Sequence, residues 1–147
     1  MKSISNLINH ISSAKNSNLK TITFSWITQN NNNTKVNHNS VQNILKILRY
    51  SGYIRGFDYG LTVFSRKNYQ IKHQIIIHLK YDEFGKNVIN WITLISTPSI
   101  AKYATTKYLW QLRNTPGLSI ISTPIGIITD DEARRYNVGG YLLFTIG

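Results

Sequence analysis

The apolar residues in the first half of the chain change their spacing from the period of a helix to that of a strand. The positions i, i+3, i+4 and i+7 are apolar twice, at Ile4, Leu7, Ile8 and Ile11 and at Val41, Ile44, Leu45 and Leu48. This spacing places apolar side chains along one face of a helix. From Ile71 to Leu79, apolar and polar residues largely alternate instead, as in a strand with one buried face. The first half therefore predicts two helices that cover a β-sheet.

Cap and turn residues suggest where these elements begin and end. Asn39 or Ser40 is expected to cap the second helix, and Gly52 is expected to end it. Strands are predicted over 21–26, 53–57, 61–65 and 71–79. A turn at 58–60 would join the second and third of them, so that the last three form a three-stranded antiparallel meander. The polar tract 29–33, with its four consecutive Asn, is expected to be a flexible loop.

The second half predicts a smaller, mostly β lobe with short helices. Strands are expected over 88–95, 118–122 and 141–146, and a short helix over 105–112. Thr129 to Glu132 has the Thr-x-x-Glu pattern of a capping box for a helix through Tyr136, and Asn137 to Gly140 would then turn the chain into its last strand. The expected architecture is α+β with an N-terminal lobe over 1–80, a connecting turn over 81–87 and a C-terminal lobe over 88–147.

The charge of the chain indicates a polyanionic partner. Seventeen Lys and Arg stand against six Asp and Glu, for a formal net charge of +11. Basic and aromatic residues are interleaved at Arg49, Tyr50, Tyr53, Arg55, Phe57, Tyr59, Arg66, Lys67 and Tyr69. Such interleaving suits phosphate contacts with bases stacked beside them. The alternative is that these aromatics fill the core while the basic side chains are solvated.

The sequence does not favour an enzyme or a metalloprotein. The chain has no Cys, which excludes disulfides and thiolate-bound metals. His73 and His78 are expected on opposite faces of a strand, so no metal site is predicted, and no cofactor is expected. Asp130, Asp131 and Glu132 would be the acidic cluster of a hydrolase or phosphotransferase. Because the capping box accounts for all three, we expect no catalytic activity.

The segment from Ser122 to Gly126 lies between a predicted strand and the capped helix. Hydroxyl and backbone N–H groups on a rigid turn can reach RNA phosphates, 2′-hydroxyls and base edges without positive charge. A plain connection between the two elements is the alternative.

The string from Gly117 to Arg135, continued by Val138-Gly139-Gly140, resembles the C-terminal signature of the small-subunit ribosomal protein eight family. Segments nearer the N-terminus also resemble the family's pattern, at 4–11, 47–54, 79–81, 96–98 and Tyr103. The resemblance covers almost the whole chain, and its main gap is the stretch 29–39. It implies a two-lobed α/β protein that binds a helical junction of small-subunit ribosomal RNA. In this role the protein remains in the subunit as a structural component beside other small-subunit proteins.

The resemblance also implies which residues bind RNA. These are Ser122, Thr123, Pro124 and Gly126 in the family's Ser-Thr loop, its RNA-packing tyrosine Tyr103, and Lys15, Gly139, Gly140 and Tyr141. The family's loop usually has a lysine where this chain has Ile125, so hydroxyl and backbone contacts are expected there rather than charge-based ones. A stand-alone regulator that binds messenger RNA is the alternative function.

The cellular location is expected from the amino-acid composition, which hints at an A/T-rich genome. Ile, Asn, Lys and Tyr make up 58 of the 147 residues, and all four are encoded by A/T-rich codons. No import or secretory leader is visible after Met1, and no run of about 18 apolar residues would span a membrane. We therefore expect a mitochondrial ribosomal protein made inside the organelle, with a plastid or the bacterial cytoplasm as alternatives. Neither a membrane nor a small-molecule substrate is an expected partner.

Overall fold

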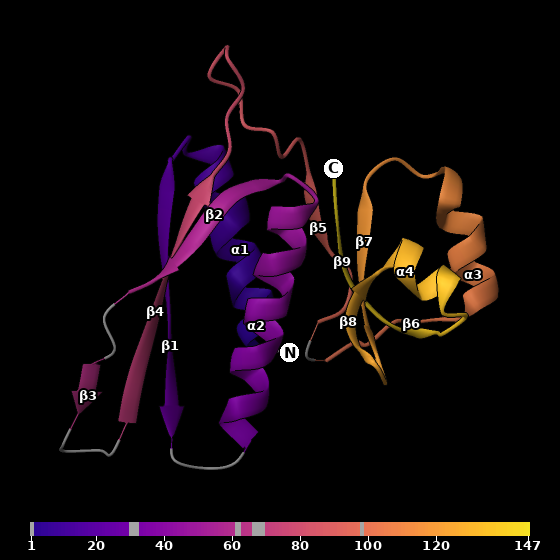
Figure 1. The fold of residues 1–147 in the computed structure, drawn as a ribbon, viewed down its shortest axis with the longest axis horizontal. Helices are drawn as coiled ribbons and strands as arrows, with labels where there is room; N and C mark the ends of the chain where they lie inside the picture. The colour runs from indigo at the N-terminus through magenta and orange to yellow at the C-terminus, as the bar shows by residue number, and fades with distance from the viewer. Residues whose placement is uncertain (1, 30–32, 61–62, 66–69, 98) are drawn as a thin grey trace. The chain divides into compact units, whose positions relative to one another are not determined.

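The chain divides into two units, each built on its own antiparallel sheet (Figure 1). The computed structural model describes residues 2–29, 33–60, 63–65, 70–97 and 99–147. The N-terminal unit comprises residues 6–88, and the C-terminal unit comprises residues 89–147 together with residues 1–5. The α+β class predicted from the sequence is confirmed.

A central strand organises the N-terminal unit. Its elements are α1 (Lys2–Asn16, whose first residues count with the other unit), β1 (Thr21–Gln29), α2 (Asn33–Tyr50), β2 (Ile54–Tyr59), β3 (Val63–Ser65) and β4 (Gln70–Leu79). Strand β4 pairs antiparallel with β1 along one edge and with β2 and then β3 along the other. Figure 1 shows α1 and α2 on the same face of this sheet. The predicted pair of N-terminal helices on an antiparallel sheet is therefore confirmed.

The core of this unit follows the two sequence periods. Strand β1 buries Ile22 and Phe24, which are paired with the buried Ile77 and Ile75 of β4. The helices bury the apolar stripes, at Leu7, Ile8 and Ile11 and at Val41, Ile44, Leu45 and Leu48, while Ile4, also buried, counts with the other unit. Full burial of one such side chain stabilises a fold by about 1.5–3 kcal/mol.

The end of α2 is as predicted, but its beginning is not. Gly52 has φ +80°, and the backbone N–H of Tyr53 donates to the carbonyl of Leu48 at 2.9 Å, which closes the helix. The helix begins at Asn33, so the prediction of a cap at Asn39 or Ser40 is wrong. No Gly or Pro interrupts 33–40, and an Asn or Ser inside a helix costs well under about 1 kcal/mol relative to Ala. Of the polar tract predicted as a loop, residues 30–32 lie outside the described part of the chain.

The predicted turn at 58–60 is also wrong. Strand β2 continues through Tyr59, and the N–H of Gly60 donates to the carbonyl of Gln74 on β4 at 2.9 Å. Strands β2 and β3 therefore follow one another along the same edge of β4 and do not form a hairpin.

The C-terminal unit has a five-stranded sheet. Its elements are β5 (Ile92–Leu94), β6 (Tyr103–Ala104), α3 (Thr106–Gln111), the 3₁₀ helix η1 (Leu112–Asn114), β7 (Leu118–Thr123), β8 (Gly126–Thr129), α4 (Asp130–Arg135) and β9 (Gly140–Ile146). The strand order is β5-β9-β7-β8, and β6 pairs with the other end of β9. Strand β5 is shorter than the predicted 88–95 because the N–H groups of Asn90 and Trp91 both donate to the carbonyl of Gly147. Strands β6 and β8 were not predicted.

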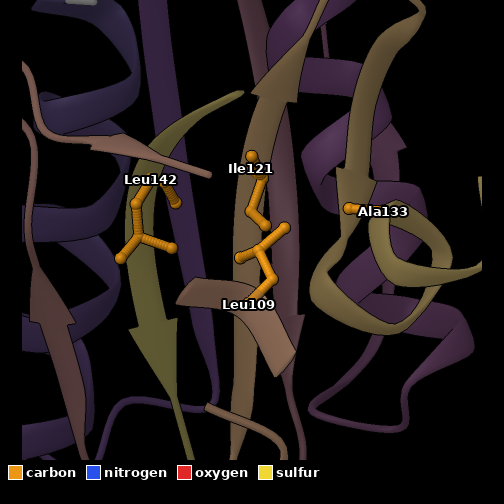
Figure 2. Packing of buried hydrophobic residues seen from close by; sticks show 5 residues of the cluster. Leu109, Ile121, Ala133 and Leu142 are labelled. Carbon is orange, nitrogen blue, oxygen red and sulfur yellow. The ribbon is translucent and has the colours of Figure 1, made fainter. Parts of the chain in front are cut away.

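Helices α3 and α4 pack on one face of this sheet through a small apolar cluster (Figure 2). The cluster consists of Ala104, Leu109, Ile121, Ala133 and Leu142, all buried. Leu109 comes from α3 and Ala133 from α4, while Ile121 and Leu142 come from neighbouring strands. None of the described helices is both long enough and apolar enough to cross a membrane.

The capping box of α4 is confirmed, and an ion pair that was not predicted lies beside it. The Thr129 side chain accepts from the N–H of Glu132, and the Glu132 carboxylate accepts from the N–H of Thr129. The Asp130 carboxylate accepts from Arg134 at 2.7 Å and from the backbone N–H of Ser119 on β7 at 3.2 Å. Arg134 also donates to the carbonyl of Leu109 on α3 at 3.2 Å. These bonds connect α4 to both β7 and α3.

Replacing Asp130 with Ala should destabilise the protein more than replacing Thr129 with Ala. Thr129→Ala removes a cap, which typically costs about 1 kcal/mol. Asp130→Ala leaves the buried Arg134 guanidinium without this carboxylate, and such a loss costs roughly 3–5 kcal/mol. Urea unfolding measures both. Asp131→Ala removes ion pairs whose carboxylate is exposed and leaves the Asp130–Arg134 pair in place, so it should cost less than about 1 kcal/mol. Equal losses for Asp130→Ala and Asp131→Ala would contradict this assignment.

Candidate nucleic-acid interface

Eight of the nine sequence-predicted RNA-binding residues meet at one end of the C-terminal sheet. Ser122 is paired with Tyr141 across β7 and β9, and Tyr141 is paired with Tyr103 across β9 and β6. Thr123 and Gly126 are paired where β7 turns into β8. We call this group the strand-end site, which consists of Ser122, Thr123, Pro124, Gly126, Tyr103, Gly139, Gly140 and Tyr141.

Three side chains of the strand-end site project away from α3 and α4. Ile121 and Leu142 point into the apolar cluster beneath those helices (Figure 2). Because successive side chains on a strand point to opposite faces, Ser122 and Tyr141 project from the other face. Tyr103, paired with Tyr141, projects there too. Ser122, Tyr141 and Tyr103 therefore form a row across three strands.

The two tyrosines of this row contact each other and remain open to a ligand. Their ring centroids lie 5.4 Å apart with an interplanar angle of 83°, an edge-to-face arrangement. Tyr103 is 62% exposed and Tyr141 is 47% exposed. Such a pair is worth about 0.5–1.5 kcal/mol beyond burial, so the exposed ring surface is held in place.

Gly139 and Gly140 are required because the backbone and a tyrosine come too close for a side chain. A Cβ at Gly140 would collide with the carbonyl oxygen of Ser122 on β7. A Cβ at Gly139 would lie 2.9 Å from the Tyr103 hydroxyl and 2.8 Å from the carbonyl oxygen of Ala104. Neither glycine is among the described residues with a positive φ, whereas Asn137 has φ +52°. The turn that was predicted over 137–140 is therefore made by Asn137, and the glycines allow close packing.

The two hydroxyls at this end of β7 differ in what they can offer a ligand. The Thr123 hydroxyl donates to the carbonyl of Gly126 at 2.7 Å, so its proton is used within the turn and its oxygen remains an acceptor. Among the described residues, the half-buried Ser122 hydroxyl makes no hydrogen bond. Ser122 can therefore both donate to a phosphate oxygen and accept from a 2′-hydroxyl. At the exposed tip, Ile125 presents an apolar side chain that is 60% exposed.

The strand-end site contains no charged residue. Within the part of the chain that the structure describes, no group of three or more His, Asp or Glu side chains is placed to hold a metal ion. The acidic residues 130–132 are occupied in the cap and ion pairs of α4. The site can thus act by hydrogen bonding and ring stacking.

Lys15 is the one predicted residue outside this group. It lies in the last turn of α1, in the N-terminal unit, whereas the strand-end site belongs to the C-terminal unit. Its role in RNA binding stays a prediction.

Comparison with known proteins adds the following similarities. Residues 3–146 match the family of ribosomal protein S8. The small ribosomal subunit protein uS8 of Nitrobacter hamburgensis is 41% identical over 104 residues, which cover 71% of this chain and 74% of that protein. The uS8 protein of Rhodopseudomonas palustris is 40% identical over 104 residues with the same two coverages. That of Paracoccus denitrificans is 41% identical over 103 residues, which cover 70% of this chain and 73% of that protein.

Replacing Gly140 with Ala should destabilise the protein and deform the strand-end site. The added methyl group must push β9 away from the Ser122 carbonyl, and overpacking of this kind typically costs about 1–3 kcal/mol. Denaturant unfolding measures the loss. Gly56→Ala on β2 is the control because no atom lies within 4 Å of its Cβ position, and it should be neutral or slightly stabilising. Wild-type stability for Gly140→Ala would show that β7 and β9 tolerate separation.

Proposed function

Because the chain belongs to the ribosomal protein S8 family, we propose that it is a structural component of the small ribosomal subunit that binds ribosomal RNA. In this role it supports subunit assembly and translation beside neighbouring small-subunit proteins, and it catalyses no reaction. The observation that carries the proposal is the strand-end site, where the Ser122 hydroxyl and two tyrosines lie on one sheet face beside the turn from β7 to β8.

The chemistry of this site suits RNA recognition by shape. Exposed rings such as Tyr103 can stack on an unpaired base or pack on a ribose. The Ser122 hydroxyl is placed on a strand, so little entropy is lost when it meets a phosphate or a 2′-hydroxyl. We assign RNA contacts to the eight residues of the strand-end site, and a phosphate contact to Lys15.

We place the protein in the mitochondrial ribosome because its composition is rich in amino acids that A/T-rich codons encode. A plastid or the bacterial cytoplasm remains the alternative location, and the relatives reported above are bacterial. Cosedimentation of the protein with small subunits from purified mitochondria would support the proposed location. Its recovery only in another compartment would contradict it.

Ser122→Ala should weaken binding to small-subunit ribosomal RNA without changing the stability of the protein. The variant removes a hydrogen-bonding group that no described residue uses, and a bond to a charged partner is worth about 1.5–3 kcal/mol, or roughly ten-fold or more in Kd. Tyr103→Ala should lose a comparable amount, since stacking of one base is worth about 1–3 kcal/mol. Filter binding with a ribosomal RNA fragment that spans a helical junction measures both.

Ser119→Ala provides the matched control for this experiment. Ser119 lies on the same strand, its hydroxyl makes no hydrogen bond among the described residues, and it is outside the strand-end site. Its replacement should leave Kd unchanged. Equal affinity for Ser122→Ala, Tyr103→Ala and Ser119→Ala would rule out the strand-end site as the RNA contact.

Sedimentation separates a ribosomal component from a stand-alone regulator of messenger RNA. A structural component should sediment with small subunits and stay there at salt concentrations that preserve the particle. Recovery of the protein only in fractions lighter than the subunit would favour the regulator.

A further inference from the structure

A basic hollow lies in the N-terminal unit, where the sheet meets the end of α2. It has a volume of about 870 Å³ and is lined by the starts of β1 and β2, the end of β4 and the last turn of α2. Its lining includes four basic residues and two aromatic ones, Lys20, Arg49, Arg55, Lys80, Phe57 and Tyr81. All of them belong to the unit of residues 6–88.

The pairing of the strands brings these residues together from distant parts of the sequence. Thr21 and Gly56 are both paired with His78, from opposite edges of β4. The register of β2 shifts between Ile54 and Gly56, so Arg55 lies in a bulge, a feature that redirects a side chain at a strand edge. The hydroxyl of Tyr81 donates to the carbonyl of Leu19 at 2.8 Å and so fixes the far side of the hollow.

The positive charges of the hollow are not neutralised within the described structure. Lys20, Arg49, Arg55 and Lys80 are all exposed, and none of them pairs with an Asp or Glu among the described residues. The one carboxylate that lines the hollow, Asp58, is 2.9 Å from Nε2 of His78. Four cations against one carboxylate leave the hollow positive, and a hollow with an excess of one charge concentrates the electric field, which attracts an anion.

The lining also offers ring surface. Phe57 and Tyr81 are half-buried, and Phe57 is held edge-to-face against Tyr59 with ring centroids 6.1 Å apart. Cations beside aromatic rings in an open groove are the combination that binds single-stranded RNA, through phosphates and stacked bases respectively. An acidic peptide would use the cations but would gain less from the rings.

We propose that the basic hollow is a second RNA-binding site, which holds the phosphodiester backbone of a single-stranded RNA segment. The inference rests on the proposed function, because it assumes that the protein works on RNA. In this proposal, the cations of the basic hollow neutralise RNA phosphates, which the uncharged strand-end site cannot do. The two sites share no residue and can therefore be tested separately.

Gly56 allows a test in which shape stays constant and only charge changes. The space within 4 Å of its Cβ position is empty, and Gly56 is not among the described glycines with positive φ, so a side chain fits there. Gly56→Glu places a carboxylate at the hollow, whereas Gly56→Gln places a neutral side chain of nearly the same shape. With a labelled oligouridylate of about 12 nucleotides, Gly56→Glu should bind about ten-fold more weakly than Gly56→Gln at low salt. Equal affinity of the two variants would overturn the proposal.

A second pair of variants measures the phosphates that the hollow neutralises. The combined variant Arg49→Gln, Arg55→Gln, Lys80→Gln removes three charges from the hollow. Its control, Lys46→Gln, Lys72→Gln, Lys86→Gln, removes three exposed charges of the same unit outside the hollow. The logarithm of the binding constant for the oligouridylate decreases with the logarithm of the salt concentration. This slope should become less steep by about 2 for the first variant and by less than about 0.7 for the second. Equal slopes would overturn the proposal.

The ribosomal RNA fragment separates failure of this proposal from failure of the proposed function. If the wild-type protein binds no RNA, both fail. If Ser122→Ala weakens binding while Gly56→Glu and Gly56→Gln bind alike, only the basic hollow is wrong. A glutamate peptide of about 12 residues that displaces the oligouridylate at equal charge concentration would assign the hollow to an acidic protein segment instead.

Discussion

The C-terminal unit depends on how closely β9 approaches β7 at Gly140. No Cβ fits between Gly140 and the carbonyl oxygen of Ser122, so the two strands can pair in this register only with glycine at that position. This register places Tyr141 opposite Ser122 and, through β6, opposite Tyr103. It also points Leu142 into the cluster under α3 and α4. The packing of the core and the geometry of the strand-end site are therefore consequences of the same close contact.

Polar contacts on the other face hold the helices against this sheet. The Asp130 carboxylate connects the Arg134 side chain to the backbone of β7, and Arg134 reaches the carbonyl of Leu109 on α3. An acidic cluster that would otherwise suggest catalysis has a structural role here. Because both helices are fixed to β7, the face that carries Ser122 is supported from behind, and a rigid surface is what recognition of RNA by shape requires.

The sequence predicted the elements whose signals are local and repeated. It did not predict elements that form only because a distant strand pairs with them. The helical stripes, the stop at Gly52 and the capping box of α4 were each found because propensity and burial agree there. Strand β6 has two residues, too few for an alternating pattern, and it exists because β9 pairs with it. The strand-end site was indicated by family resemblance, while Lys20 and Lys80 could not be joined to Arg49 and Arg55 without knowing the order of the strands.

In the proposed account, the two units divide recognition of RNA between shape and charge. Residues 6–88 hold eleven Lys and Arg against three Asp and Glu, whereas the strand-end site has no charge. A density map of the small subunit with this protein bound tests the central claim most directly. We expect the Ser122 hydroxyl within hydrogen-bonding distance of RNA and a base or ribose against the Tyr103 ring. A map in which the strand-end site faces solvent or another protein would contradict the account.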